Sequence, residues 1–258
     1  MRTRTRLIPA ALLVTLLLAS PSLLAGQRFV YRFQEGDTWK MSERSETATE
    51  TMGTQMVQRA KRLTVYKVTR DLGKRWVRIA SQIVSQKNWD NDGQVNEMNS
   101  FAGMQFSADV HQLGTLKGYK ATGGNPQMAQ MLGPAMKPAI FFFPEFPEEA
   151  LEPGDEFDAV IRYEMPGMMG MGGMKSAIKL TYTLEDVSDG YATFSIKQRM
   201  KMEGSGMDMK TGGKSEAVFD ISQGMWVEHE TVTKSVVEQG PGAGGSVLTR
   251  SKVTLEKK

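Results

Sequence analysis

In most of this chain, apolar and polar side chains alternate residue by residue. Between residues 157 and 165, apolar residues occupy every second position, with charged residues such as Asp158 and Arg162 between them. Such alternation is typical of an antiparallel sheet that buries one face and leaves the other in water. The clearest alternating sets are Phe157, Ala159, Ile161, Tyr163 and Met165; Ile178, Leu180, Tyr182 and Leu184; Ala192, Phe194 and Ile196; Ala217, Phe219 and Ile221; and Val247, Val253 and Leu255.

Short turn signals separate these stretches. Asp71–Gly73, Ser188–Gly190 and Ser222–Gly224 each begin with a polar or acidic residue and end in a glycine. Few connections are long enough for the helical crossovers that parallel strands need, so we predict a meander. The expected fold class is mainly β, a curved antiparallel sheet or incomplete barrel.

The two halves of the chain share landmarks in the same order. A Gly-Asp pair opens each half, at Gly36 and at Gly154, and a turn glycine follows 37 or 36 residues later, at Gly73 or Gly190. We therefore predict two tandem antiparallel β units related by duplication. The expected division is 1–25 signal peptide, 26–120 first β unit, 121–148 linker helix and apolar Pro-rich segment, and 149–258 second β unit.

The first 25 residues have the order of a secretory signal. Arg2, Arg4 and Arg6 precede the apolar run from Leu7 to Ala19, and a small residue precedes Gly26. The run is shorter than the ~20 residues that a membrane-spanning helix needs. We expect cleavage before Gly26 and a soluble, exported protein, either periplasmic or secreted.

Charge and cysteine content exclude several functions. The chain has 32 basic and 29 acidic residues, and the signal carries three of the arginines, so the mature protein is expected to be neutral. A neutral domain lacks the positive field that nucleic-acid binding requires. The absence of cysteine excludes disulfides, thiolate metal sites and a cysteine nucleophile.

The only helical signal lies between the two halves. Asn125 is a plausible N-cap, Pro126 suits the first helical position, and Gly133 would end the helix. The predicted short Met-rich helix places Met128, Met131 and Leu132 on one face, and an apolar run with Phe141, Phe142 and Phe143 follows. We expect this segment to cover the apolar face of the sheet; a sharper alternative is that it gates a hydrophobic cavity.

Several landmarks resemble an uncharacterised family of secreted bacterial β proteins with repeated Gly-Asp-x-Trp/Phe motifs. They are Tyr31-x-Phe33-x-x-Gly36-Asp37-x-Trp39, Phe143-Pro144-x-x-Pro147, Gly154-Asp155, Gly190-x-Ala192 and Asp220-x-x-x-Gly224. The chain differs in having Phe157 where that family often has tryptophan. The resemblance implies an exported β protein without an assigned activity. A fainter likeness, in architecture alone, is to periplasmic half-barrel carriers of lipoproteins, which hold an acyl chain under a helix.

The sequence offers little for catalysis. His229 lies in an alternating stretch where we expect it to face solvent, and His111 also lies beside strand residues. Ser205 lacks the spacing of a nucleophile elbow. Asp37 and Asp155 precede strands, where turn chemistry is the simplest explanation. We therefore expect no enzyme and no catalytic residues.

Methionine is the unusual component, with 19 residues. Two Gly-rich loops, near 166–174 and 204–213, carry many of them and should be neighbours at one end of a meander, together with 240–245. Thioethers without thiols suit Cu(I) or Ag(I), whereas flexible methionines also suit varied apolar ligands. A loop without any partner is the third interpretation.

The functional hypothesis is non-catalytic binding of an apolar ligand or lipid-bearing partner in the concavity, without a cofactor. The candidate ligand-binding residues are Met128, Met131, Leu132, Phe141, Phe142 and Phe143. The first alternative is soft-metal binding, with Cu(I), by Met168, Met169, Met171, Met174, Met207 and Met209. The second is a structural module of the cell envelope.

Overall fold

The computed structural model describes residues 26–51, 53–90, 93, 95–97, 104–123, 136–137, 140–141, 143–165, 174–203, 208–239 and 243–258. The predicted signal peptide lies outside these residues. The strands are β1 (Thr38–Thr51), β2 (Thr54–Gly73), β3 (Trp76–Trp89), β4 (Val95–Glu97), β5 (Gln105–His111), β6 (Leu116–Thr122), β7 (Glu156–Met165), β8 (Met174–Ser188), β9 (Tyr191–Glu203), β10 (Asp208–Asp220), β11 (Met225–Gln239) and β12 (Ser246–Lys257). The expected mainly β class is confirmed.

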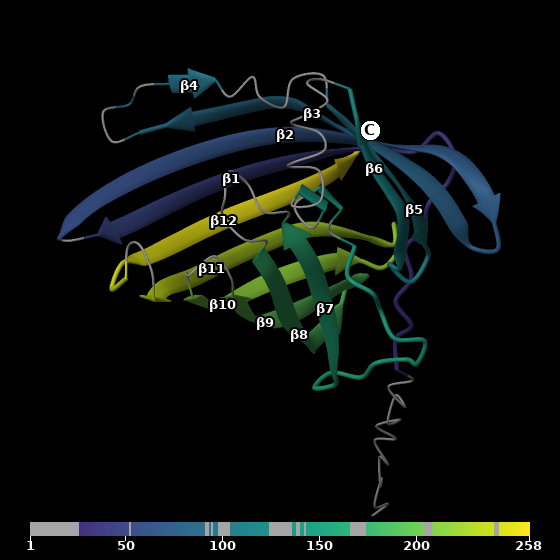
Figure 1. Ribbon diagram of the computed structural model, residues 1–258. Coiled ribbons are helices and arrows are strands. Elements are labelled where there is room, and N and C mark those ends of the chain that lie inside the picture. Colours follow the sequence, from purple (N-terminus) through teal and green to yellow (C-terminus); the bar gives the residue numbers. More distant parts are fainter. Residues whose placement is uncertain are drawn as a thin grey trace, which may run out of the picture.

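All these strands belong to one antiparallel sheet, with the order β6-β5-β3-β2-β1-β12-β11-β10-β9-β8-β7 and β4 paired to β3. The sheet does not close in this part of the chain, because β6 and β7 are its two edges. Figure 1 shows a strongly curved sheet, in which β5, β6, β7 and β8 run at a steep angle to the central strands β1, β12 and β11. The expected curved sheet is therefore present.

The expected division into two tandem units is wrong. Each half of the chain forms a meander, but β1 pairs with β12 from Trp39 opposite Lys257 to Glu50 opposite Ser246. A single cluster of buried side chains also draws on both halves. Local landmarks predicted the turns within each half, whereas the pairing of the first strand with the last depends on contacts between residues far apart in the sequence.

The two Gly-Asp turns are built alike. The Asp37 carboxylate accepts a hydrogen bond from the Gln34 N–H over 3.0 Å, and that of Asp155 accepts one from the Glu152 N–H over 2.8 Å. The Gly36 N–H donates to the carbonyl oxygen of Val68. These carboxylates are used in turns, as predicted, and each turn fixes the start of a strand.

Two segments outside the main sheet cover the base of the concave face. The N-terminal segment (residues 26–35) and the linker segment (residues 140–141 and 143–151) meet at a bridge between Gln27 and Leu151. Phe146 of the linker segment stacks on Phe29 at 5.5 Å and on Trp226 at 5.6 Å between ring centroids. Aromatic rings contribute large apolar areas to a core, so these segments complete the core of the sheet.

The predicted Met-rich helix at 126–132 lies outside the described residues. The described helical residues in the linker are 136, 137 and 140. Phe141 and Phe143 are buried in the core, as expected of a covering segment. Pro144 and Pro147 lack an N–H to donate, which favours the extended conformation seen here.

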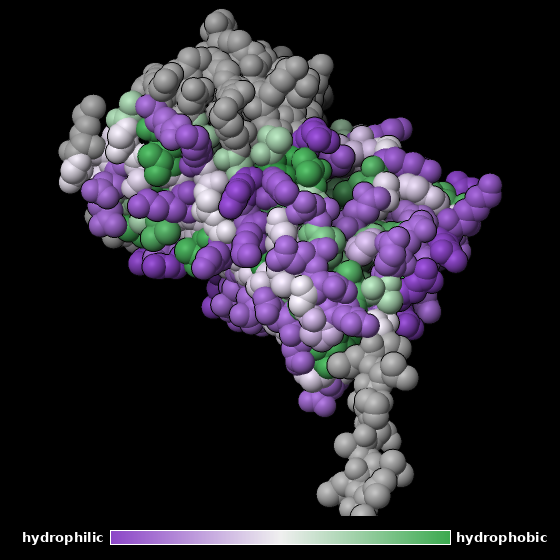
Figure 2. Space-filling view, turned by 90° about the horizontal axis from the view of Figure 1, so that it is seen from below, coloured by the Kyte–Doolittle hydropathy of each residue, from purple (hydrophilic) through white to green (hydrophobic). Residues whose placement is uncertain are grey.

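Polar side chains cover much of one face of the molecule (Figure 2). Seen from below, the molecule is mostly hydrophilic, with hydrophobic residues in small separate groups (Figure 2). Among the described residues, no helix is both long and apolar enough to cross a membrane.

Candidate functional site

A row of small side chains crosses the concave face of six neighbouring strands. Cross-strand register places Ser45 opposite both Ala60 and Ser251, and Thr231 opposite both Ser251 and Ser215. Ser215 lies two residues from the core residue Ala217, so the row shares the face of the core. We call Ala60, Ser45, Ser251, Thr231, Ser215 and the adjoining Ile196 the hydroxyl row.

A cavity of about 1250 Å³ is centred on the hydroxyl row. Its lining comes from β1, β2, β9, β10, β11 and β12, from Trp89 at the end of β3, and from Asp90 and Gly93 after it. Six neighbouring strands can border one hollow only from the concave side of a curved sheet, so the cavity lies in the concavity. Pockets for small molecules commonly enclose roughly 300–1,000 Å³. This cavity is therefore large enough for a sizeable ligand.

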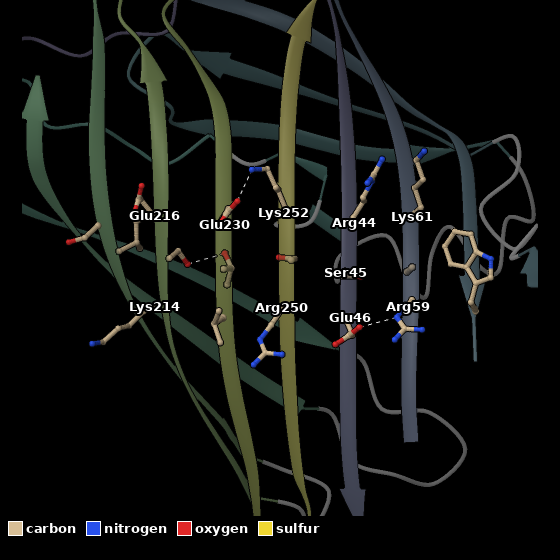
Figure 3. A pocket seen from close by; sticks show the side chains of 18 of the residues that line it. Arg44, Ser45, Glu46, Arg59, Lys61, Lys214, Glu216, Glu230, Arg250 and Lys252 are labelled. Atoms are coloured by element: carbon tan, nitrogen blue, oxygen red, sulfur yellow. Dashed lines mark hydrogen bonds and ion pairs between the residues drawn. The ribbon is translucent and has the colours of Figure 1, made fainter. Parts of the chain in front are cut away.

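Long charged side chains flank the hydroxyl row on the same strands. Figure 3 shows one line of them on one side of Ser45 and a second line on its other side. Because neighbouring residues of a strand point to opposite faces, these charges belong to the outer face. The first line contains Glu216, Glu230, Lys252, Arg44 and Lys61, and the second contains Lys214, Arg250, Glu46 and Arg59.

Hydroxyl pairs continue along the inner face toward the hairpin ends. Ser215 and Thr231 share a hydrogen bond of 2.9 Å between their side-chain oxygens, and Thr211 and Ser235 share one of 2.7 Å. Hydroxyl groups that bond each other keep their oxygens satisfied while presenting carbon atoms to the cavity. The wall thus combines small apolar surfaces with exchangeable hydrogen-bond partners.

An ion pair and an imidazole lie between the hydroxyl row and the aromatic base. Arg62 Nη2 contacts Glu43 Oε2 at 2.5 Å, and both side chains are largely buried. His229 shares a hydrogen bond of 3.1 Å between its Nε2 and the Thr231 hydroxyl. These residues line a smaller cavity of about 180 Å³ with Tyr66, Trp226 and other apolar side chains. Polar groups therefore converge at the inner end of the concavity.

The expected solvent-facing position of His229 is wrong. A bulge in the ladder between β10 and β11 pairs Trp226 with Phe219 and Glu228 with Val218, leaving Val227 as the extra residue. A bulge reverses the alternation of the residues that follow it. Trp226 and His229 consequently both face inward, and burial lowers the pKa of His229 to about 4. The imidazole is uncharged at neutral pH.

The phenylalanine segment borders a third hollow, at the open side of the sheet. This cavity of about 580 Å³ lies between Leu116 of β6 and residues 157–162 of β7, and Phe141 and Phe143 contribute to its lining. Of the other candidate ligand-binding residues, Met128, Met131, Leu132 and Phe142 lie outside the described residues. Ligand binding by this segment stays a prediction.

The Met-rich hairpins do meet at one rim of the sheet. Met174 begins β8 opposite Met165, Met209 lies opposite Met202, and Lys175 pairs with Glu203. The candidate metal residues Met168, Met169, Met171 and Met207 lie outside the described residues. Within the described residues, no group of three or more His, Asp or Glu side chains is arranged to hold a metal ion.

Neither the hydroxyl row nor the Glu43–Arg62 pair was predicted from the sequence. A signal for the row was present, since Ser45, Thr47 and Thr49 continue the alternation of Trp39 and Met41 at every second position. The ion pair had no such signal, because its formation depends on the register between β1 and β2.

The fold and its cavities define an antiparallel β protein with an open, curved sheet and a ligand-sized concavity. No family model matches the chain, and no curated protein matches it. Solved structures with some similarity include a protein described as exported, with a YMCC-like fold, from Bacteroides fragilis NCTC 9343 (14% identity, 89% of this chain and 99% of that chain, TM-score 0.37).

Two further similar structures come from outer-membrane and autotransporter proteins. One is an outer membrane channel from Pseudomonas putida F1 (10% identity, 88% of this chain and 97% of that chain, TM-score 0.40). The other is the translocator domain of the autotransporter NalP from Neisseria meningitidis (10% identity, 86% of this chain and 89% of that chain, TM-score 0.33). At this level of similarity no family is assigned.

Proposed function

We propose that this chain is an exported, non-catalytic binding protein that holds an amphipathic ligand in its concavity. The observation that carries the proposal is the cavity of about 1250 Å³ bordered by six strands. Concave sites with a few convergent polar groups are the usual places for small ligands. The apolar part of the ligand would lie along the hydroxyl row, and its polar end would reach Glu43, Arg62 and His229.

The charges at the inner end favour a ligand with a neutral polar group. Glu43 and Arg62 neutralise each other, and His229 is uncharged at neutral pH because burial lowers its pKa to about 4. An additional charged group here would have to be desolvated without a free counter-ion, which is costly. Hydroxyl, ester or amide groups can instead exchange hydrogen bonds with these side chains.

Binding is a better interpretation than catalysis for the same residues. His229 contacts the Thr231 hydroxyl at 3.1 Å, a geometry that a general base and a nucleophile would also use. An effective general base has a pKa near the working pH. With a pKa of about 4, the His229 imidazole is a weak base toward a threonine hydroxyl.

Tryptophan fluorescence offers a direct test, because Trp89 lines the large cavity. The mature protein would be titrated with a brominated monoacylglycerol, an uncharged amphiphile whose bromine atoms quench nearby indoles. We expect saturable quenching, to which Trp226 at the inner end of the concavity contributes. Mass spectrometry of protein purified from native extracts would then identify a natural amphiphile.

Cavity-filling variants test whether the ligand occupies the concavity. Ser251→Phe and Ser215→Phe place a ring in the hydroxyl row and should weaken binding at least tenfold. Thr254→Phe places the same ring on the outer face of β12 and should bind like the parent protein. Equal affinity in all three variants, or the absence of saturable quenching, would reject the proposal.

Soft-metal binding is a second candidate, supported by the meeting of the Met-rich hairpins at one rim. Titration with Cu(I) would compare the parent protein with a variant in which Met168, Met169, Met171 and Met174 are leucine. Weaker binding in the variant would support this candidate, and equal affinity would eliminate it.

A further inference from the structure

Four exposed cations gather on the outer face of β9, β10 and β11. Lys197 and Arg199 come from β9, Lys214 from β10 and Lys234 from β11, and all four are exposed. Within the described part of the chain, none of them forms an ion pair. We call these four residues the basic patch.

Neighbouring cations on the same face do have partners. Lys210 contacts Glu238, and Lys179 contacts Asp158, each at 2.8 Å. In the basic patch, by contrast, Lys197 lies directly opposite Lys214 in the ladder between β9 and β10. Like charges directly opposite each other on a sheet are destabilising. Repulsion between these cations does not stabilise the fold. Binding of an anionic partner would explain why they lie together.

A glycine leaves open space among these cations. Gly212 of β10 lies opposite Arg199 on one side and Lys234 on the other. A side chain at this position would meet no atom within 4 Å. The patch therefore surrounds a shallow, accessible site where a phosphate group could approach several cations at once.

Exposed apolar side chains adjoin the basic patch. Val232 and Val236 are 46% and 38% exposed, and they alternate with Lys234 on the outer face of β11. Val232 lies opposite Lys214. Cations next to exposed apolar side chains match the two layers of a bilayer interface, the phosphates and the upper acyl chains.

We propose that this face docks on the surface of an anionic phospholipid bilayer. Lys197, Lys214 and their neighbours would contact headgroup phosphates, while Val232 and Val236 would enter the headgroup layer. This inference goes beyond the proposed function and does not depend on whether the concavity holds a ligand. If both hold, docking would bring the concavity close to a source of amphiphiles.

Vesicle co-sedimentation tests the docking. The mature protein would be mixed with vesicles of phosphatidylcholine alone and with vesicles that also contain phosphatidylglycerol. We expect sedimentation only with the anionic vesicles, and release at high salt because exposed charges are screened. Each cation near an anionic surface contributes roughly 1 kcal/mol, so the double variant Lys197→Gln, Lys214→Gln should partition about 30-fold more weakly.

A matched control removes the same charge elsewhere. Lys67 and Arg70 are exposed on β2, and the variant Lys67→Gln, Arg70→Gln should bind anionic vesicles like the parent protein. Val232→Ser with Val236→Ser should weaken binding without altering charge. Circular dichroism would verify that each variant is folded. If both charge variants lost the same amount of vesicle binding, the effect would be one of net charge and the proposal would be overturned. Absence of sedimentation with either kind of vesicle would also overturn it, and is the result expected if the partner is an acidic protein.

Discussion

Trp226 donates a hydrogen bond from its indole Nε1 to the hydroxyl oxygen of Tyr31 over 2.8 Å, although the residues are 195 positions apart. The same hydroxyl donates to the carbonyl oxygen of Pro144 over 3.0 Å. Tyr31 thus joins β11, the N-terminal segment and the linker segment at the buried base. We expect Tyr31→Phe to lower the free energy of unfolding by about 1–3 kcal/mol, because the Trp226 indole N–H and the Pro144 carbonyl oxygen would each lose a hydrogen-bond partner.

Urea denaturation would measure this loss. Tyr191 is 45% exposed, and the control variant Tyr191→Phe should change the free energy of unfolding by less than about 0.5 kcal/mol. Equal stability of Tyr31→Phe and the parent protein would contradict the assigned role of the hydroxyl.

The Glu43–Arg62 pair should stabilise the fold far more than the Glu46–Arg59 pair on the same two strands. The first pair is 23% and 15% exposed, and the second is 41% and 61% exposed. Removing one partner of a buried pair leaves an uncompensated charge and costs about 3–5 kcal/mol, whereas exposed pairs contribute about 0–1 kcal/mol. Arg62→Gln should therefore destabilise strongly and Arg59→Gln weakly.

Double-mutant cycles would separate the pairwise energies. The cycle of Glu43→Gln with Arg62→Gln should give the larger coupling in urea unfolding, and the cycle of Glu46→Gln with Arg59→Gln serves as the internal reference. Similar couplings in the two cycles would show that the inward position confers no protection from solvent.

His229 should make stability depend on pH. Burial lowers its pKa to about 4 in the folded protein, and an unfolded histidine has a pKa of about 6.5. Between these values the unfolded state binds more protons, so stability falls as pH falls. At about 1.4 kcal/mol per pH unit, the loss from pH 7 to pH 5 should be about 2 kcal/mol.

The variant His229→Gln should lack this contribution. Urea denaturation at both pH values would compare the parent protein, His229→Gln and the control His111→Gln. If the parent protein and the His229→Gln variant lost the same free energy of unfolding between pH 7 and pH 5, the inward, desolvated position of the imidazole would be disproved.

Gly114 should tolerate alanine less well than Gly190. Both have positive φ angles, +102° and +83°. A β-carbon at Gly114 would overlap the carbonyl group of Pro144, whereas one at Gly190 would meet no atom within 4 Å. Gly190→Ala should cost about 1–2 kcal/mol from backbone strain alone, and Gly114→Ala about 2–5 kcal/mol because crowding is added.

Thermal or urea unfolding of the two variants would test this contrast. The comparison reports on the contact between the turn after β5 and the linker segment. If the two variants were equally stable, the linker segment would not lie against that turn.

Local patterns predicted much of the sheet. The alternation at Phe157, Ala159 and Ile161 falls within β7, and Ala217 and Phe219 are buried on β10. Gly190 lies in the turn between β8 and β9, whereas Gly73 ends β2 directly before the turn at Lys74 and Arg75; both glycines have positive φ angles. These features were predictable because burial of one sheet face and the geometry of a tight turn act on residues close together in the sequence.

The linker and the site were less predictable. Burial of Phe141 and Phe143 was expected, but the contact of their segment with the N-terminal segment was not predicted. The position of His229 was mistaken because a single bulge at Val227 reverses the face of every later residue on β11. The alternation of apolar and polar residues does not indicate where such a bulge occurs.

The sequence by itself determined that this chain forms antiparallel strands, where many of them turn, and which faces are apolar. Tertiary structure alone decided that β1 pairs with β12, that Glu43 meets Arg62, and that side chains from six strands border one cavity. The reason is that alternation and turns are local, whereas register between distant strands is chosen by the packing of the whole core.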